Sequence, residues 1–415
     1  MVDIVVGLQL GDEGKGRIAD YLANSAAIVA RVQGGNNAGH TITIGNNIYK
    51  LHHIPCGVLR GIKSLLCAGM VIDPDILISE LDNLEKLNIC TENIHIDGSA
   101  HIILDLHKDI DGNQENKRNT SIGTTKRGIG PAYTTKYARY GIRFWDLVAN
   151  NPDVLKNKLE NIVDFFHLDR SLVEKNMEKL TSEKYLSRFS KMVCETHLII
   201  KDALNNDEKI IIEGAQGAFL DIDYGMYPFV TSSCTTSAGA LLGTRLNYKN
   251  INAVYGVTKA YTTYVGNGHF PAEEHCPTQY LLEKGNEYGT TTGRARRCGW
   301  LDLPMLRSSI SINGVDRLVL TKLDVLSGLD EIYYVDNYLL DGKIIDYYPA
   351  DPNAFSRVKP VLKSMPGWKE DISNCDYVYS LPTAAQDFCF MLEAKLRTRL
   401  SIISIGPERQ QLIHM

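Results

Sequence analysis

Short apolar runs rich in β-branched residues recur along the whole chain and predict the strands of a buried sheet. They cover residues 4–6, 27–32, 65–72, 209–213, 251–257, 318–322 and 401–405. Between many of them lie stretches with helical periodicity, such as residues 74–87. This alternation predicts an α/β protein with a mostly parallel central sheet flanked by helices.

Three segments depart from this alternation. Residues 41–51, with a Gly-Asn-Asn turn in the middle, predict a β-hairpin inserted after the second strand. Residues 146–206 are charged, helix-periodic and poor in glycine, which predicts a helical excursion from the sheet. Residues 110–140 are dense in Gly, Thr, Lys, Arg and Asn with little periodicity, so we expect a long functional or mobile loop there.

The length of 415 residues allows two or three average domains, or one large α/β domain with insertions. Linkers rich in Ser or Pro and internal repeats are absent from the sequence. We therefore prefer a single elaborated domain over residues 1–415.

Charge and cysteine content narrow the class of protein. The chain has 44 Lys and Arg against 49 Asp and Glu and no basic block, which argues against a nucleic-acid partner. Its nine cysteines are scattered without a C-x-x-C pair, so we expect neither disulfides nor zinc, and a reducing compartment. A signal peptide and an apolar stretch of about 18 residues are both missing, which predicts a cytoplasmic protein that does not enter a membrane.

A glycine-rich loop follows the first predicted strand and precedes a helical stretch. Residues 11–16 read Gly-Asp-Glu-Gly-Lys-Gly. Glycines let backbone N–H groups converge on an oxyanion, the helix N-terminus adds partial positive charge, and Lys15 adds a full one. The loop is similar to a P-loop, but six residues separate Gly7 from Gly14 where the motif has four, and Gly16 replaces the usual Ser or Thr.

Asp12 is a carboxylate in a loop that would otherwise avoid negative charge. Because the missing hydroxyl at Gly16 removes the usual Mg²⁺ ligand, we interpret Asp12 as a metal ligand, a general base or both. A glycine-rich turn with an Asp cap is the structural alternative. A second glycine loop, residues 34–41, follows the second strand and is expected at the same edge of the sheet. Its His40 is a candidate hydrogen-bond donor or acid, or else a structural histidine.

Several later segments carry polar side chains suited to nucleotide binding. Residues 321–324, Thr-Lys-Leu-Asp, are similar to the element that reads guanine in GTP-binding proteins, where the carboxylate accepts two hydrogen bonds that adenine cannot donate. Residues 290–297 gather hydroxyls and three arginines, which suits a dicarboxylate or a phosphoryl group. Residues 121–131 suit a phosphate cover, Gln216 a purine or amide, and residues 230–233 supply hydroxyls. Each of them alone is also compatible with a surface cap, a solvated basic turn, a flexible loop or a structural turn.

Taken together, these blocks closely resemble the adenylosuccinate synthetase family. The similar blocks are residues 9–16, 33–40, 123–125, 321–324 and 404–407. The resemblance implies a GTP-dependent ligase that condenses IMP with L-aspartate to adenylosuccinate, GDP and phosphate through a 6-phosphoryl-IMP intermediate. This reaction is the first committed step from IMP to AMP in purine nucleotide biosynthesis. The implied fold is related to P-loop NTPases, with helical and loop insertions.

The resemblance also implies roles for single residues. Asp12 removes the N1 proton of IMP, His40 acts on the phosphoryl side, and Lys15 and Gln216 complete the catalytic set. Asp12 and the Gly39 carbonyl hold Mg²⁺. IMP is contacted by Asp12, Glu13, Gly14, Lys15, Asn37, Ala38, Gly39, His40, Thr125, Arg139, Gln216, Thr231 and Arg294. GTP is contacted by Gly11, Asp12, Glu13, Gly14, Lys15, Gly16, Arg17, Gly39, His40, Thr41, Arg296, Lys322, Leu323, Asp324, Ser404, Ile405 and Gly406. Aspartate is contacted by Thr290, Thr291, Thr292, Gly293, Arg294, Ala295 and Arg296.

A homodimer is implied as well, in which Arg139 reaches the site of the partner subunit. Three positions depart from the family's usual residues, namely Leu10, Cys234 and Ala295, and Ala295 interrupts an otherwise all-arginine run. The motifs leave two rival functions open, a GTP-binding switch protein and a phosphoryl-activating ligase with another acceptor. A switch protein requires neither His40 nor the arginines of residues 294–297.

Overall fold

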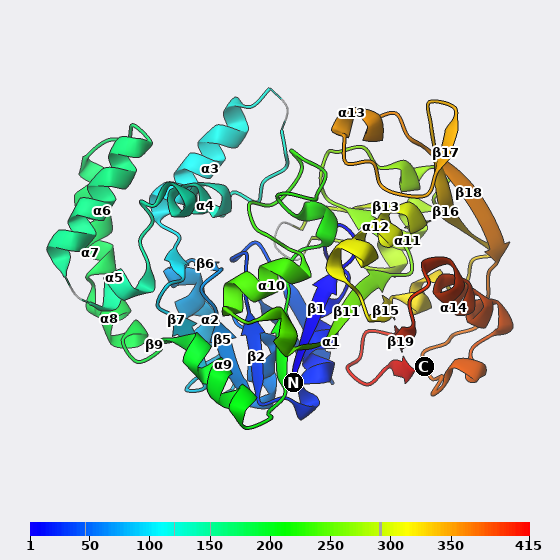
Figure 1. The fold of residues 1–415 in the computed structure, drawn as a ribbon, viewed down its shortest axis with the longest axis horizontal. Helices are drawn as coiled ribbons and strands as arrows, with labels where there is room; N and C mark the ends of the chain where they lie inside the picture. The colour runs from blue at the N-terminus through cyan, green and yellow to red at the C-terminus, as the bar shows by residue number, and fades with distance from the viewer. Residues whose placement is uncertain (46, 120, 150, 290–292) are drawn as a thin grey trace.

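A ten-stranded sheet forms the centre of the computed structural model, which describes residues 1–415 except 46, 120, 150 and 290–292 (Figure 1). Its strands lie in the order β20 (Leu412–His414), β19 (Leu400–Ser404), β15 (Arg317–Thr321), β11 (Ile251–Lys259), β1 (Val2–Gly7), β10 (Ile210–Glu213), β2 (Ile28–Arg31), β5 (Lys63–Leu66), β7 (Ile94–Asp97) and β9 (Val193–Cys194). Neighbouring strands are parallel, apart from the antiparallel pair β19 and β20. The predicted mostly parallel sheet is confirmed.

Alternate strand residues pack into two separate hydrophobic cores, because successive side chains of a strand point to opposite faces. Ile4 and Val6 lie in one core and Val5 lies in the other. The first face is covered by α9 (Thr196–Asn205), α10 (Ser237–Thr244), α12 (Leu303–Asn313) and α14 (Thr383–Leu396). The second face is covered by α1 (Lys15–Leu22), α2 (Pro74–Lys86), α3 (Asp105–Lys117), α5 (Phe144–Val148), α6 (Pro152–Phe165), α7 (Ser171–Leu180) and α8 (Glu183–Phe189). Burial on both faces explains why the strands are continuous apolar runs.

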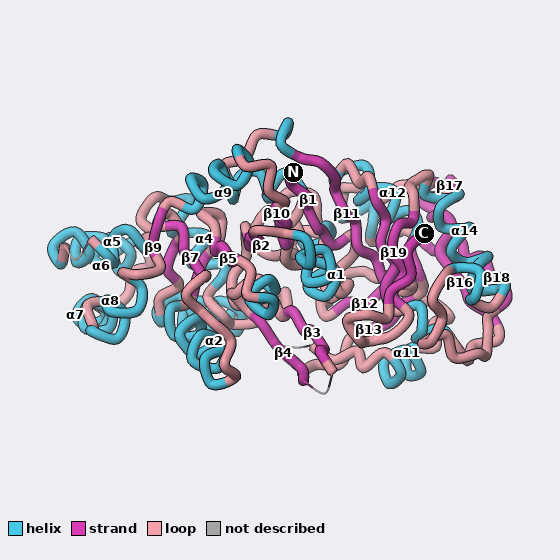
Figure 2. The backbone as a smooth tube through the Cα atoms, turned by 90° about the horizontal axis from the view of Figure 1, so that it is seen from below, coloured by secondary structure: helices cyan, strands magenta, loops and turns pink. Residues whose placement is uncertain are grey.

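Smaller strand groups surround the central sheet. The predicted hairpin is confirmed as β3 (His40–Ile44) and β4 (Asn47–Leu51), which Figure 2 shows as a pair set apart from the sheet. A second sheet contains β14 (Leu301–Asp302), β16 (Glu331–Leu340), β17 (Lys343–Ile345) and β18 (Lys359–Pro366). The remaining pairs are β6 (Val71–Ile72) with β8 (His101–Ile102), and β12 (Thr262–Tyr264) with β13 (Arg297–Gly299). The apolar run of residues 65–72 is therefore two strands, β5 and β6, separated by a turn at residues 68–69.

The predicted long loop over residues 110–140 is wrong at both ends, and only residues 118–128, of which 120 is not described, lie between two helices. Helix α3 continues to Lys117, and α4 (Ile129–Ala138) follows. Proline is tolerated in the first turn of a helix, where its missing N–H has no helical partner, so Pro131 does not prevent α4. Both helices are fixed by burial, α3 through Leu106 and Ile110 and α4 through Ile129 and other residues. The composition of residues 110–140 suggests a loop, but the packing of apolar side chains stabilises two helices there.

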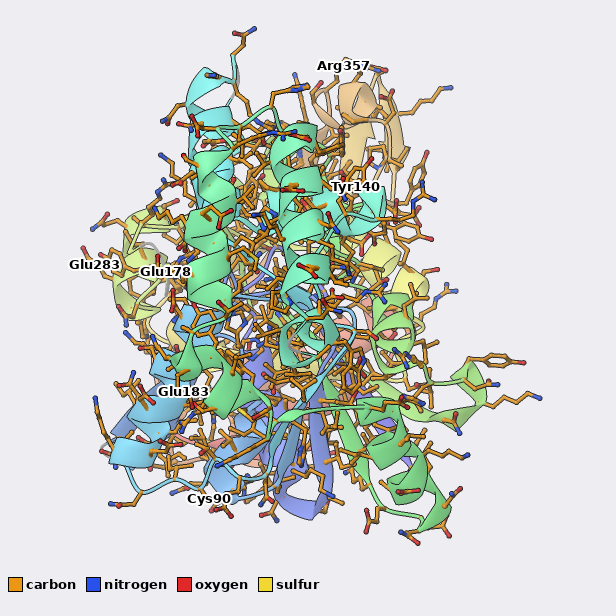
Figure 3. All side chains as sticks on the ribbon, turned by 90° about the vertical axis from the view of Figure 1, so that its left-hand side faces the viewer. Cys90, Tyr140, Glu178, Glu183, Glu283 and Arg357 are labelled. Carbon is orange, nitrogen blue, oxygen red and sulfur yellow. The ribbon has the colours of Figure 1, made fainter. Side chains whose placement is uncertain are left out.

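Residues 146–206 contain the end of α5, the helices α6 to α9 and the short strand β9. Figure 3 looks onto this end of the molecule, where the exposed side chains of Glu178 and Glu183 are labelled. The other helices are α11 (Thr278–Lys284) and α13 (Pro352–Phe355). Short 3₁₀ helices cover Ala23–Ser25, Cys56–Arg60, Ala218–Leu220, Tyr248–Asn250, Pro271–Glu273, Leu323–Leu326 and Val378–Ser380. No helix in the described part of the chain has the length and apolarity that crossing a membrane requires.

Candidate active site

A large cavity lies where the loops after β1, β2, β10, β15 and β19 converge, at the carboxyl edge of the parallel sheet. Its volume is about 1070 Å³, above the roughly 300–1,000 Å³ of an ordinary small-molecule site, so it has room for more than one ligand. The predicted site residues that line it are Gly11, Asp12, Gly14, Lys15, Gly16, Arg17, Asn37, Ala38, Gly39, His40, Thr41, Thr125, Gln216, Thr231, Gly293, Arg294, Arg296, Lys322, Asp324, Ser404 and Gly406.

Other predicted site residues lie elsewhere. The Glu13 side chain is fully buried inside the first loop, where it pairs with Lys15 and accepts hydrogen bonds from the backbone N–H groups of Gln9 and Gly11, at 3.1 and 2.9 Å. Leu323 and Ile405 are buried in the core, Ala295 is exposed, and Arg139 is exposed at the end of α4. Thr290, Thr291 and Thr292 lie outside the described residues.

The glycine at position 16, which replaces the usual hydroxyl residue, makes room for His40. A Cβ atom added at Gly16 would lie 2.7 Å from the Cβ of His40, much closer than real Cβ contacts. Gly7 similarly makes room for the Glu13 and Lys15 side chains. The glycine at position 16 therefore has a steric reason, since it lets the second glycine loop pack against the first.

Three cavity residues other than glycine that lie in loops after strands of the central sheet adopt the left-handed backbone conformation, as does Asn286 in the cavity wall. The φ angles are 59° at Asp12, 56° at Gln216 and 62° at Lys322. Such a conformation costs about 1 kcal/mol or more for a residue with a Cβ, and it is concentrated at functional sites. All three line the cavity, and all three lie in loops that end strands of the central sheet.

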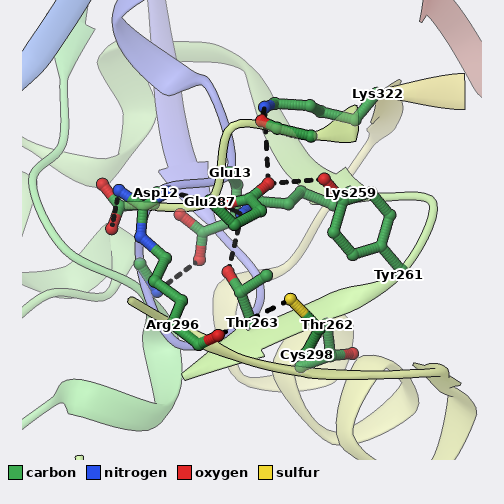
Figure 4. Close-up of polar contacts among 12 residues, drawn as sticks. Asp12, Glu13, Lys259, Tyr261, Thr262, Thr263, Glu287, Arg296, Cys298 and Lys322 are labelled. Atoms are coloured by element: carbon green, nitrogen blue, oxygen red, sulfur yellow. Dashed lines mark hydrogen bonds and ion pairs between the residues drawn. The ribbon is translucent and has the colours of Figure 1, made fainter. Parts of the chain in front are cut away.

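The Asp12 carboxylate is 33% exposed and lies 2.8 Å from the Nη2 atom of Arg296 (Figure 4). A second nitrogen of the same guanidinium contacts Glu287, which is fully buried. Burial lowers the pKa of Arg296, but Asp12 and Glu287 outweigh it and raise that pKa overall. The guanidinium therefore bridges a fixed buried carboxylate and a carboxylate that is open to the cavity.

His40 is oriented by a buried carboxylate. Its Nδ1 atom is hydrogen bonded to Oε1 of Glu213, and the other Glu213 oxygen accepts a hydrogen bond from the Cys56 N–H at 2.9 Å. Burial would raise the pKa of Glu213, but His40 and Arg31 lower it to about 2, so the carboxylate is ionised. Burial lowers the pKa of His40, and Glu213 opposes this shift. Since an ionised carboxylate only accepts, Nδ1 donates, and Nε2 is left for a ligand.

Lys322 and Asp324 of the Thr-Lys-Leu-Asp element line the cavity together with the C-terminal loop of residues 404–411, which contributes Ser404, Gly406 and Pro407. Burial raises the pKa of Asp324, while Lys322 and Arg17 oppose the shift. The Arg17 guanidinium donates to Ser404 Oγ at 2.6 Å and to backbone carbonyls of residues 406, 408 and 411. Arg17 thus fastens this C-terminal loop to α1, the helix that follows the first glycine loop.

Polar amides line the opposite side of the cavity. Asn37 Nδ2 donates to Thr231 Oγ1 at 3.2 Å, and Gln33 holds the Gln216 loop through the Ala215 backbone. The Nε2 atom of Gln216 is buried without a hydrogen-bond partner among the described residues. A buried donor without a partner costs about 1–3 kcal/mol, which a bound acceptor would recover.

Two important residues escaped the analysis of the sequence. Glu213 was noticed only as the end of a strand, and its pairing with His40 joins positions far apart in the chain. Glu287 belongs to no recognisable motif, although it lies just before residues 290–297. Within the described residues, no cluster of three or more His, Cys, Asp and Glu side chains suits a metal ion.

Comparisons with known proteins agree with the family resemblance of the sequence motifs. The family model described as adenylosuccinate synthetase matches residues 4–413. The adenylosuccinate synthetases of Gloeothece citriformis and Clostridium novyi are 42% and 43% identical, over 99% of this chain and 93% and 98% of theirs. The solved structure of the fully ligated adenylosuccinate synthetase of Plasmodium falciparum has a TM-score of 0.93 at 40% identity, covering 100% of this chain and 99% of its own. A cyanophage S-2L succinoaminodeoxyadenylate synthetase bound to dGMP and dATP, at 20% identity, shares the fold with a TM-score of 0.63, covering 100% and 95%.

Proposed function

The chain belongs to the adenylosuccinate synthetase family, and from this membership we propose how its cavity condenses IMP with aspartate at the expense of GTP. The predicted function in AMP biosynthesis is confirmed. One observation carries the assignment of the site: Asp12 presents a carboxylate inside a phosphate-binding loop, beside Arg296 and within one cavity with His40 and Asp324. A GTP-binding switch protein does not require that combination.

Asp12 accepts the proton from N1 of IMP, and the 6-oxygen then bonds to the γ-phosphorus of GTP while GDP leaves. Lys15, which is 3% exposed, and His40, which takes up a proton on Nε2 when the anionic phosphoryl group is bound, stabilise the charge on the transferring group. The amine of aspartate next bonds to C6 of the purine, and phosphate leaves. The buried Nε2 of Gln216 supplies a hydrogen bond to the bound purine nucleotide. This placement is supported by the fact that all four residues line the same cavity.

Guanine is read by Asp324 and framed by Lys322, Ser404 and Gly406. The carboxylate of Asp324 accepts from N1–H and from the exocyclic amine, a pair of donors that adenine lacks. IMP lies against Asn37, Thr125, Thr231 and the first two glycine loops. Aspartate is held by residues 290–296, of which Gly293, Arg294 and Arg296 line the cavity.

Mg²⁺ is the metal implied by the family, with the Asp12 carboxylate and the Gly39 carbonyl as its protein ligands. Both residues line the cavity, and both offer hard oxygen donors. Mg²⁺ typically takes one or two protein oxygens and completes its shell with phosphate oxygens and water, so this small donor set fits. When bound, the ion neutralises phosphate charge. The role of the Asp12 side chain itself is proton abstraction.

A homodimer completes the site. Arg139 lies outside the cavity of its own chain, at the exposed end of α4, and Tyr137 and Tyr140 beside it are 73% and 39% exposed. Exposed aromatic and arginine side chains on one surface are typical of protein interfaces. Arg139 of each subunit then contacts IMP bound by the partner. The cytoplasmic location stays a prediction.

The test is a coupled measurement of products. Purified protein with Mg²⁺, GTP, IMP and aspartate should form adenylosuccinate, GDP and phosphate in equal amounts, and phosphate release should stop when IMP is omitted. Asp12→Asn should lower turnover by about 10²- to 10⁴-fold in a folded protein, because the general base is lost. Asp202→Asn, at an exposed position of α9, is the matched control and should retain full turnover. Phosphate release that is equal with and without IMP would contradict the function.

A further inference from the structure

Glu287 lies just outside the cavity wall and is fully buried, yet its carboxylate serves four side chains (Figure 4). Oε2 accepts from Lys259 Nζ at 2.9 Å and from Arg296 Nη1. Oε1 accepts from the Tyr261 hydroxyl at 2.5 Å and lies 3.3 Å from Lys322 Nζ. The backbone carbonyl of Glu287 also accepts from the Arg296 N–H at 2.9 Å.

Two of the four partners of Glu287 are buried behind the site, and the other two line the cavity. Lys259 and Tyr261 are fully buried behind the site, and Lys259 also donates to Thr263 Oγ1 at 2.6 Å. Arg296 and Lys322 line the cavity, one beside Asp12 and the other in the guanine-binding element. One carboxylate therefore connects two residues of the cavity wall that are separate in sequence.

The charges make this connection necessary. Three cations surround one buried carboxylate, and without Glu287 the Arg296 guanidinium would keep only its contact with Asp12 among the described residues. Burial would raise the pKa of Glu287, but Lys259, Lys322 and Arg296 hold it well below its usual range. The carboxylate is therefore ionised throughout the working pH range.

We propose that Glu287 is a positioning residue for the ligase reaction. Its carboxylate fixes Arg296 and Lys322 relative to each other, and thereby fixes the aspartate-binding and guanine-binding parts of the cavity relative to each other. When Asp12 turns from Arg296 to the N1 proton of IMP, Glu287 keeps the guanidinium in place. This inference rests on the site proposed above. Asp12→Asn tests that site separately, since its result does not depend on Glu287.

The competing explanation is that Glu287 only neutralises the buried Lys259. A single Glu287→Gln substitution does not separate the two, because it leaves Lys259 buried without a counter-charge. The double variant Lys259→Gln, Glu287→Gln does, since it removes both charges of this buried pair and so avoids the cost of leaving one of them buried without its partner. It removes the buried cation that the Glu287 carboxylate would neutralise, while Arg296 and Lys322 still lose the carboxylate that they contact.

In the folded double variant, the KM for aspartate and the KM for GTP should rise together, each by about tenfold or more, with a smaller change in kcat. Tenfold corresponds to about 1.4 kcal/mol, the size of one charged hydrogen bond. KM values within twofold of the wild type, or a rise in only one of them, overturn the proposal. If Asp12→Asn retains full turnover, the site itself is wrong, which is a different outcome.

Should the double variant fail to fold, Tyr261→Phe provides the same test with all charges kept. It removes one hydrogen bond from Glu287, and both KM values should rise by about two- to fivefold. Tyr338→Phe is its matched control, because the Tyr338 hydroxyl donates to the buried Asp302 at 2.6 Å, outside the cavity. Equal KM values in the two variants overturn the proposal.

Discussion

The Nδ1 atom of His40, at the end of the second glycine loop, is hydrogen bonded to Oε1 of Glu213, at the end of β10. The two residues are distant in sequence but adjacent in space, since β10 pairs with β2 in the central sheet. The buried carboxylate fixes which ring nitrogen carries the proton and directs Nε2 to the ligand. A carboxylate in this role acts through the histidine and not on the substrate.

Glu213→Gln should therefore lower kcat by about tenfold or more and leave the KM for IMP nearly unchanged. The amide no longer requires Nδ1 to be the donor, so part of the population holds the wrong tautomer. Glu80→Gln is the control: Glu80 is buried, accepts the backbone N–H groups of His52 and His53, and lies outside the cavity. Full kcat in a folded Glu213→Gln protein would contradict the assigned role.

Asp324→Asn should reduce the preference for GTP over ATP by about ten- to a hundredfold, because an amide cannot accept both guanine donors. Recognition requires the ionised acid, and burial raises the pKa of Asp324. In the wild type the KM for GTP should therefore begin to rise at a higher pH than for an ordinary aspartate as the solution is made acidic. Steady-state kinetics between pH 7 and pH 5 measure this. Asp330→Asn, at a side chain that is 90% exposed, should behave as the wild type.

Gly16→Ser should not restore a working P-loop but should impair the enzyme. The new Cβ would lie 2.7 Å from the Cβ of His40 and would displace the ring that Glu213 orients. We expect kcat to fall by about a hundredfold, which is the scale of losing an acid catalyst. Gly112→Ala in α3 meets nothing within 4 Å and should leave kcat unchanged, with a stability gain of about 0.5–1 kcal/mol. A Gly16→Ser enzyme with wild-type kcat would show that His40 does not need this space.

Asp302→Asn should change the dependence of stability on pH. Burial raises the pKa of Asp302 from 3.8 to about 6, although the Tyr338 hydroxyl opposes the shift. Between those values the folded protein binds the proton more tightly than the unfolded chain, so this stability is present below about pH 4 and is lost as pH rises through 6. The wild type should lose up to about 3 kcal/mol relative to Asp302→Asn between pH 4 and pH 7. Denaturant unfolding measures the difference, and parallel curves for the two proteins would disprove it.

The sequence alone determined the class of fold, the hairpin and the family. β-branched runs and helical periodicity are local properties, and they identify buried strands and helices without reference to distant residues. The glycine loops and the Thr-Lys-Leu-Asp element were recognisable for the same reason, because binding phosphate or guanine needs particular residues at short, fixed spacing. The failure over residues 110–140 marks the limit of this reasoning, since α3 and α4 form where tertiary packing outweighs unfavourable composition.

Only the tertiary structure decided which side chains act on one another. The pairs His40–Glu213, Asp12–Arg296 and Glu287–Lys322 each join segments whose separation in sequence contains no regular spacing. His40 and Glu213 meet because the parallel strands β2 and β10 bring their carboxyl ends to one edge of the sheet. Asp12 and Lys322 follow strands β1 and β15 of the same sheet, and Glu287 and Arg296 reach them from the segment between α11 and β13. Glu13 is the opposite case. Its place in the motif suggested a ligand contact, but its buried carboxylate accepts hydrogen bonds from the backbone of its own loop. Local chemistry thus predicted the ligands, while long-range packing set the partners that orient the residues around them.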